Sequence, residues 1–130
     1  MPISTSIHPR PRSPNIQIYR PQLTSVLSIV NRISGVLLSL YAFALVAWLM
    51  AVAAGPQAYS MVQAIVRSWP AQILLFMATF AFCLHLCGSI RHLVWDAVRG
   101  FELRTIYASG WLMLATSGAL TVAIWMAARY

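Results

Sequence analysis

The sequence predicts an all-α integral membrane protein with three transmembrane helices and an extended, Pro-rich N-terminal arm. Of its 130 residues, 60% are hydrophobic and only 8% are charged, a balance far from that of soluble domains. Three apolar stretches, 36–54, 71–90 and 107–128, each have about the 20 residues needed to cross a bilayer. The rest is too short for a soluble catalytic domain with its own core. We therefore expect residues 1–130 to form a single membrane-anchor domain.

The arm comprises residues 1–22 and holds five of the seven prolines, namely Pro2, Pro9, Pro11, Pro14 and Pro21. Proline fixes φ and removes a backbone donor, so regular helix is not expected before about residue 21. Ile16, Ile18 and Tyr19 are apolar residues that a purely solvating tail would not need. We expect an extended arm that docks on a partner, and a disordered tail is the alternative that composition alone allows.

Long helices are expected at about 24–54, 70–98 and 105–128. The first would be roughly 45 Å long at about 1.5 Å per residue, so its first two turns should lie among the inner headgroups. Gly55-Pro56 ends this helix, and Trp69-Pro70 begins the next one. Between them, residues 59–67 can form a short interfacial helix on the outer side.

All nine basic residues are arginines, and their distribution predicts the orientation of the chain. Seven lie on one side of the spans and two on the other: Arg10, Arg12, Arg20, Arg32, Arg91, Arg99 and Arg104 against Arg67 and Arg129. Because basic loops stay inside, we expect a multi-pass protein of the inner (cytoplasmic) membrane, or its mitochondrial equivalent, with the N-terminus inside and the C-terminus outside. The arginines flank membrane segments, so no nucleic-acid partner is expected despite the net charge of +7.

Two polar stripes are predicted at the inner ends of the first two spans. At about 100° per residue, Ser89, His92 and Asp96 fall within about 40° of His85. By the same count, four polar or small residues of the first helix fall within about 60° of one another: Ser28, Arg32, Gly35 and Ser39. If the two stripes face each other, they line a cavity.

His85 lies about 21 Å from the outer start of its helix, inside the hydrocarbon, where an ionisable residue is a functional candidate. A neutral imidazole is a good ligand of haem iron; the alternative is a neutral histidine bonded to a neighbouring helix. His92 lies about 10 Å farther along the same face, whereas two axial nitrogens are only about 4 Å apart, so a second ligand must come from another chain. Cys83 and Cys87 form no metal motif and are interpreted as packing residues.

Two segments carry a resemblance to a known family. The first spans residues 10–35 and contains Arg-Pro-Arg-Ser-Pro at 10–14, Ile-Tyr-Arg-Pro at 18–21, Leu-Thr-Ser at 23–25 and Ser-Ile-Val-Asn-Arg-Ile-Ser-Gly at 28–35. The second runs from His85 to Asp96 and is similar to the pattern His-x3-Gly-x-Arg-His-x3-Asp. Together they resemble the cytochrome b subunit of succinate dehydrogenase, a succinate:quinone oxidoreductase. Two positions depart from that family's pattern, with Asn31 in place of His and Ser89 in place of Gly.

The resemblance implies roles for individual residues. His85 stands at the position of the axial ligand to haem b, which the family shares with a second membrane-anchor subunit. Ser28, Arg32 and Asp96 stand at the quinone site beside the iron-sulfur subunit, with ubiquinone or menaquinone as substrate. The haem is expected to contact Arg32, His92 and Ser39 as well. Succinate would be oxidised on the flavoprotein subunit, and electrons would reach the membrane quinone beside this chain.

Other interpretations stay open at this stage. The chain could anchor a fumarate reductase, or it could be a structural anchor without a redox role if His85 only packs against another helix. A small proton-coupled exporter needs an acidic residue deep in a span, whereas Asp96 and Glu102 lie at the inner end or in the loop. Neither the direction of the reaction nor the identity of the quinone follows from the sequence.

Overall fold

The computed structural model describes residues 18–129, and every regular element in that range is a helix. The helices are α1 (Leu23–Ala54), α2 (Pro56–Val66), α3 (Trp69–Asp96) and α4 (Leu103–Arg129). Helices α1, α3 and α4 are long and apolar enough to cross a membrane, which confirms the predicted fold class. Their ends lie within two residues of the ranges expected from the sequence. The prediction for the arm up to residue 17 lies outside the described residues.

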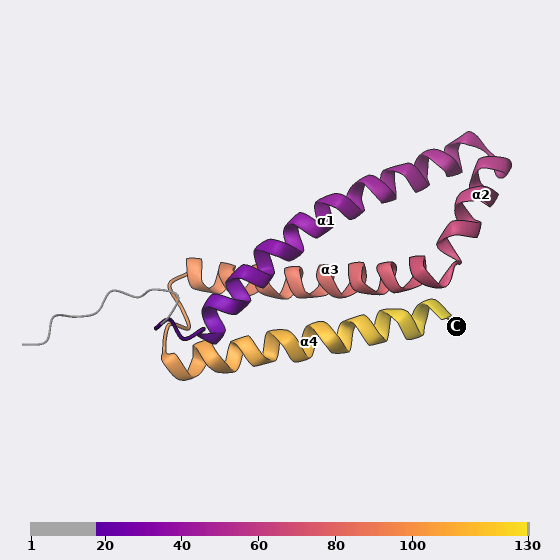
Figure 1. The fold of residues 1–130 in the computed structure, drawn as a ribbon. Helices are drawn as coiled ribbons and strands as arrows, with labels where there is room; N and C mark the ends of the chain where they lie inside the picture. Colours follow the sequence, from indigo (N-terminus) through magenta and orange to yellow (C-terminus); the bar gives the residue numbers. More distant parts are fainter. Residues whose placement is uncertain (1–17, 130) are drawn as a thin grey trace, which may run out of the picture.

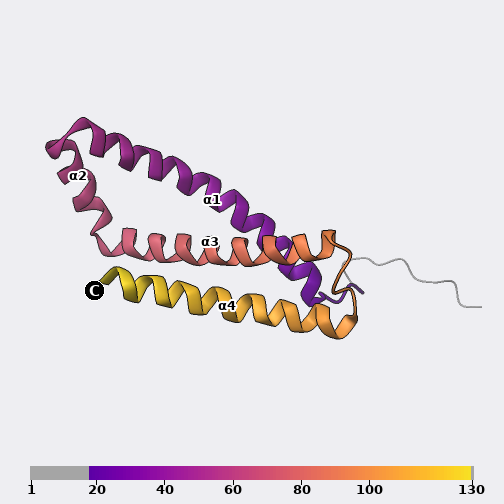
Figure 2. The same ribbon diagram turned by 180° about the vertical axis from the view of Figure 1, so that it is seen from behind.

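Two of the long helices form a pair, and the third diverges from it. Helices α3 and α4 run side by side in opposite directions (Figure 1). Helix α1 crosses α3 near the α3–α4 connection and then moves away, so the two are farthest apart where α2 joins them (Figure 2). We call these the connection end and the α2 end. The start of α1 lies at the connection end and the C-terminal end of α4 at the α2 end.

Glycine and proline set the sharp boundaries at the α2 end. Gly55 has a φ of 108°, which side chains with a Cβ rarely adopt. Pro56 opens α2, a position where the missing N–H costs no hydrogen bond. Pro70 lies in the first turn of α3. Helix α2 confirms the short helix expected between the first two spans, although it begins at Pro56 rather than at residue 59.

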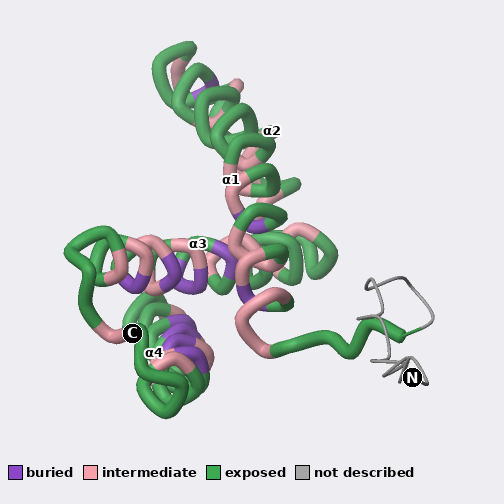
Figure 3. The backbone as a smooth tube through the Cα atoms, turned by 90° about the vertical axis from the view of Figure 1, so that its left-hand side faces the viewer, coloured by how far each residue is buried: buried purple, intermediate pink, exposed green. Residues whose placement is uncertain are grey.

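The buried core is small and lies where the three long helices meet. Leu27, Leu84 and Met113 form its centre, one from each long helix. Gly110 permits the close approach of α4 to α1, because a Cβ there would lie 2.9 Å from Cδ1 of Leu27. Burial is concentrated where α3 faces α4, and most of α1 is exposed (Figure 3). In a membrane protein these exposed apolar side chains are available to lipid or to partner helices.

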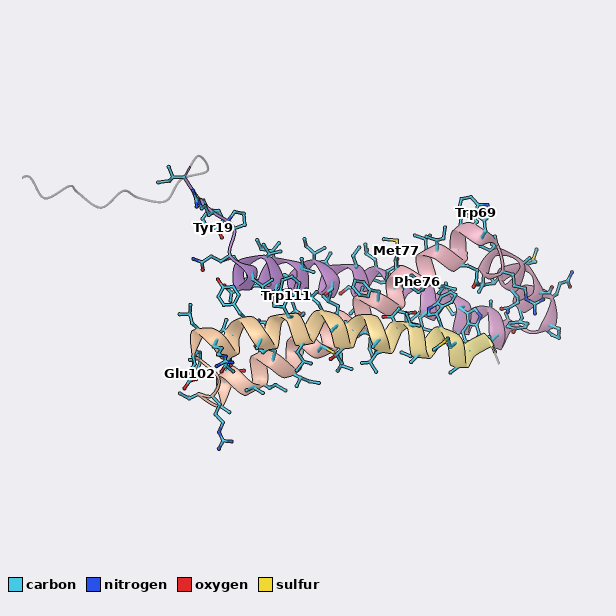
Figure 4. All side chains as sticks on the ribbon, turned by 90° about the horizontal axis from the view of Figure 1, so that it is seen from below. Tyr19, Trp69, Phe76, Met77, Glu102 and Trp111 are labelled. Atoms are coloured by element: carbon cyan, nitrogen blue, oxygen red, sulfur yellow. The ribbon has the colours of Figure 1, made fainter. Side chains whose placement is uncertain are left out.

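Amphipathic side chains mark the two ends of the bundle. Trp69 lies at the α2 end, and Tyr19 and Glu102 lie at the connection end (Figure 4). At the connection end the rings of Trp95 and Phe101 stack with centroids 6.3 Å apart. Aromatic side chains near both ends of the spans are typical of proteins anchored at two membrane interfaces.

Candidate functional site

Helices α1 and α3 cross where the two predicted polar stripes meet. Gly35 of α1 lies against His85, since a Cβ on Gly35 would be 3.0 Å from Cε1 of the imidazole. Gly88 of α3 lies equally close to α1, because a Cβ on Gly88 would overlap Oδ1 of Asn31. Small residues at such crossings let helix backbones approach closely. The crossing therefore brings the imidazole of His85 against the backbone of α1.

His85 is held through its Nδ1 atom. The carbonyl oxygen of Asn31 lies 3.0 Å from Nδ1, and because a carbonyl can only accept, Nδ1 must carry the proton. The Ser34 hydroxyl donates to the same carbonyl at 2.7 Å, so its oxygen, 3.1 Å from Nδ1, is free to accept from the imidazole. The lone pair of the neutral ring is then on Nε2, which receives no hydrogen bond within residues 18–129.

A cavity of about 490 Å³ opens between α1 and α3, nearer the connection end than His85. It is lined by Ser28, Asn31, Arg32, Ser89, His92, Leu93 and Asp96. Four of these residues, namely Ser28, Arg32, His92 and Asp96, were predicted from the sequence to belong to the site. The connection-end parts of the two polar stripes thus face each other and line one open space. Its volume is within the range of about 300–1,000 Å³ found for small-molecule pockets.

The cavity offers a cation, an acid and an imidazole that are not paired with one another. Arg32 is exposed, and within the described chain no ion pair joins it to Asp96. Nδ1–H of His92 donates to the carbonyl oxygen of Gly88 at 2.8 Å, which leaves Nε2 of His92 able to accept a proton. Such a set can bind a carbonyl or anionic oxygen and exchange protons with it.

Asn31 contributes more to the site than the sequence indicated. Its backbone carbonyl anchors His85, while its side chain lines the cavity. The side-chain Oδ1 is buried and has no hydrogen-bond partner in the described part of the chain. Because His85 is bound by the backbone of Asn31, this anchor does not depend on which side chain stands at position 31. Asn31, which stands where the family usually has His, therefore still accepts the hydrogen bond from His85 through its backbone carbonyl.

Two predicted site residues lie outside this cavity. His85 is partly buried and lies deeper along α3, away from the lining residues. Ser39 is exposed one turn beyond Gly35, and its hydroxyl donates to the Gly35 carbonyl at 3.0 Å. The candidate site therefore has two parts along one face of the α1–α3 pair, a deeper histidine and a polar cavity closer to the connection end.

Arg91 is buried, although the arginine count treats it like the solvated arginines of the inner side. It lies inside α3 and is only 8% exposed. Its Nε donates to Ser109 Oγ and its Nη2 to the Ile106 carbonyl, both at 3.0 Å. Its guanidinium also lies 4.0 Å from the centre of the Trp95 ring. The position of Arg91 on the helix indicates its contact with α4, because Arg91 falls about 120° from His85 around the helix axis and so faces a different neighbour.

The two cysteines are packing residues, as expected. Cys83 is buried and Cys87 is partly buried, and both thiols are free. Cys87 packs against the core formed by Leu27, Leu84 and Met113. Within residues 18–129, no three side chains of His, Cys, Asp or Glu gather in a way that could hold a metal ion.

Comparison with known proteins gives consistent matches along nearly the whole chain. Residues 6–124 match the family described as succinate dehydrogenase/fumarate reductase transmembrane subunit. The succinate dehydrogenase cytochrome b556 subunit of Rickettsia typhi is 38% identical over 117 residues, which cover 90% of this chain and 91% of that relative. The corresponding subunit of Paracoccus denitrificans is 35% identical over 113 residues, 87% of each chain. The mitochondrial cytochrome B subunit of Schizosaccharomyces pombe is 36% identical over 123 residues, covering 88% of this chain and 66% of the relative.

Proposed function

Because this chain belongs to the succinate dehydrogenase/fumarate reductase transmembrane subunit family, we propose that it is the haem b-binding membrane anchor of a succinate dehydrogenase and helps to form its quinone site. The observation that supports this most is the hydrogen bonding of His85. Its Nδ1–H is bound by a carbonyl oxygen, and this is the tautomer in which a histidine presents Nε2 to a metal.

His85 would hold the iron of haem b through Nε2. The donor fits the group, because a neutral imidazole in an apolar helix crossing is a common haem ligand, and Gly35 leaves room beside the ring. Arg32 and His92 lie on the connection-end side of His85, where they would bind the haem propionates, and Ser39 would contact the haem from one turn along α1. A second membrane-anchor subunit would supply the other ligand to the iron. When bound, haem b supplies a one-electron carrier within the membrane.

The cavity between α1 and α3 forms this chain's part of the quinone site. Ser28 donates a hydrogen bond to a quinone oxygen, and Arg32 stabilises the negative charge that develops there during reduction. Asp96 lies at the cavity's edge near the end of α3 and can pass protons from the inner surface. The substrate is ubiquinone or menaquinone, whose apolar tail remains in the lipid.

The connection end faces the soluble partners. The flavoprotein subunit oxidises succinate, and the iron-sulfur subunit delivers the electrons to quinone at the cavity, so this chain does not touch succinate. The N-terminal arm, residues 1–22, docks on the iron-sulfur subunit. The protein lies in the inner membrane, bacterial or mitochondrial, with its N-terminus inside and its C-terminus outside. In the reverse direction, the same arrangement would anchor a fumarate reductase.

Purification of the complex through a tag on this chain tests the proposal. We expect the flavoprotein, iron-sulfur and second anchor subunits to co-purify, with a low-spin haem b spectrum and succinate-dependent reduction of quinone. A complex that contained all these subunits but no haem would contradict the haem assignment. An anchor that purified without the soluble subunits would contradict the assembly.

A further inference from the structure

We propose that Ser34 is a positioning residue that fixes the orientation and the electron donation of His85. The proposal rests on the haem ligation proposed above and goes beyond it, because it assigns the control of the ligand to a hydroxyl on another helix. Ser34 is not part of the quinone cavity, and the sequence alone gave it no role.

The geometry gives the Nδ1–H of His85 two acceptors rather than one. The Asn31 carbonyl lies 3.0 Å from Nδ1 and the Ser34 Oγ lies 3.1 Å away. The Ser34 hydroxyl donates its own hydrogen bond to the Asn31 carbonyl at 2.7 Å. The imidazole, the hydroxyl and the carbonyl are therefore joined in a closed triangle of hydrogen bonds. Ser34 is only 4% exposed, and water does not compete strongly for these bonds.

The same segment of α1 lies close beside the imidazole. Gly35 follows Ser34, and a Cβ there would lie 3.0 Å from Cε1 of His85. Because glycine has no Cβ, the ring has room to lie against α1, and its orientation is set by the two oxygens at Nδ1.

Hydrogen bonds to the outer nitrogen of a metal-bound histidine raise its basicity. A more basic Nε2 donates more electron density to the iron and favours the oxidised state, which lowers the reduction potential. Loss of the Ser34 oxygen removes one of the two acceptors of Nδ1–H. The haem potential should then rise, and the ring should become less strictly oriented.

Ser60 of α2 provides a matched control outside the haem and quinone residues. Its hydroxyl also donates to a backbone carbonyl of its own helix, that of Gln57 at 2.8 Å, so its removal deletes the same kind of bond as the one from Ser34 to Asn31. It is exposed and has no hydrogen bond to His85. A general effect of losing a serine hydroxyl from a helix would therefore be seen in both variants.

The test is a redox titration of haem b in the assembled complex, with electron paramagnetic resonance of the oxidised form. In Ser34→Ala we expect full haem content, a raised midpoint potential and shifted or broadened low-spin g-values. Ser34→Thr, which keeps the hydroxyl, and Ser60→Ala should match the wild type. A potential in Ser34→Ala that is unchanged or lowered, with wild-type g-values, overturns the proposal.

A separate variant distinguishes this failure from failure of the haem assignment. If His85→Ala keeps a normal low-spin spectrum, His85 is not the ligand, and both the haem assignment and the positioning role of Ser34 are wrong. If His85→Ala loses that spectrum while Ser34→Ala keeps the wild-type potential and g-values, the haem assignment stands and only the positioning role of Ser34 is wrong. Should Ser34→Ala fail to assemble, Ser34→Cys retains a side-chain atom that is a weaker acceptor. That variant should shift the potential in the same direction, and an unshifted potential overturns the proposal.

Discussion

Substitution of Arg32 by leucine should lower quinone reduction while leaving succinate oxidation intact. Arg32 lines the α1–α3 cavity, is exposed, and makes no ion pair within residues 18–129. Its charge is therefore not neutralised by Asp96 and is available to a quinone oxygen. One hydrogen bond from a charged donor contributes about 2 kcal/mol, and a factor of ten in rate corresponds to about 1.36 kcal/mol. We therefore expect the rate of quinone reduction to fall by about 30-fold if the full ~2 kcal/mol is lost, and by at least about 10-fold.

The assay compares two electron acceptors in the same membranes. Succinate-driven quinone reduction should fall in Arg32→Leu, whereas reduction of an artificial acceptor by the soluble subunits should be unchanged. Arg32→Lys keeps the charge without the planar fork of donors and should fall between the two. Arg99→Leu is the matched control, because Arg99 is exposed at the same end but does not line the cavity. Quinone reduction at the wild-type rate in Arg32→Leu would refute the reasoning, and loss of both activities would show failed assembly instead.

Three further predictions concern orientation, docking and packing. A tag at residue 1 should be reached only from the inside and a tag after Tyr130 only from the outside, because of the seven-to-two distribution of arginines; labelling of both from one side would contradict three spans. Deletion of residues 10–20 should release the soluble subunits from the membrane, as measured by fractionation, and full retention would show that the arm does not dock. Arg91→Ala should lower the free energy of unfolding of the purified complex by about 3 kcal/mol, because two hydrogen bonds from a charged donor to α4 are lost. Thermal denaturation of the complex measures this loss as a lower melting temperature. Arg99→Ala should not lower it, and equal stability of the two variants would remove the structural role assigned to Arg91.

The helices themselves could be predicted because their signals are local. Long apolar runs, Gly55-Pro56 and Trp69-Pro70 each act within a few residues, so the ends of the spans fall close to the expected positions. The helical angle was also sufficient to put Ser28 and Arg32 on one stripe and His92 and Asp96 on another. These inferences need only the geometry of one helix at a time.

The contacts of the site could not be predicted because they depend on how two helices cross. His85 is bound by the carbonyl of Asn31, 54 positions away in the sequence, and a backbone acceptor has no sequence signature. The role of Ser34 follows from the same crossing, since its hydroxyl also bonds within its own helix. The burial of Arg91 could not be predicted because the positive-inside rule counts charges near span ends and does not distinguish a buried guanidinium from a solvated one.

We propose that His85, and not His92, is the haem ligand of this chain. The most direct measurement is the optical and paramagnetic resonance spectrum of the assembled complex carrying His85→Ala or His92→Ala, with subunit content as the control. His85 offers a free Nε2 at the helix crossing, whereas His92 lines the cavity nearer the connection end. We predict that His85→Ala abolishes or converts the low-spin bis-histidine spectrum and that His92→Ala shifts it only modestly. A normal low-spin spectrum in His85→Ala, together with its loss in His92→Ala, would contradict the assignment.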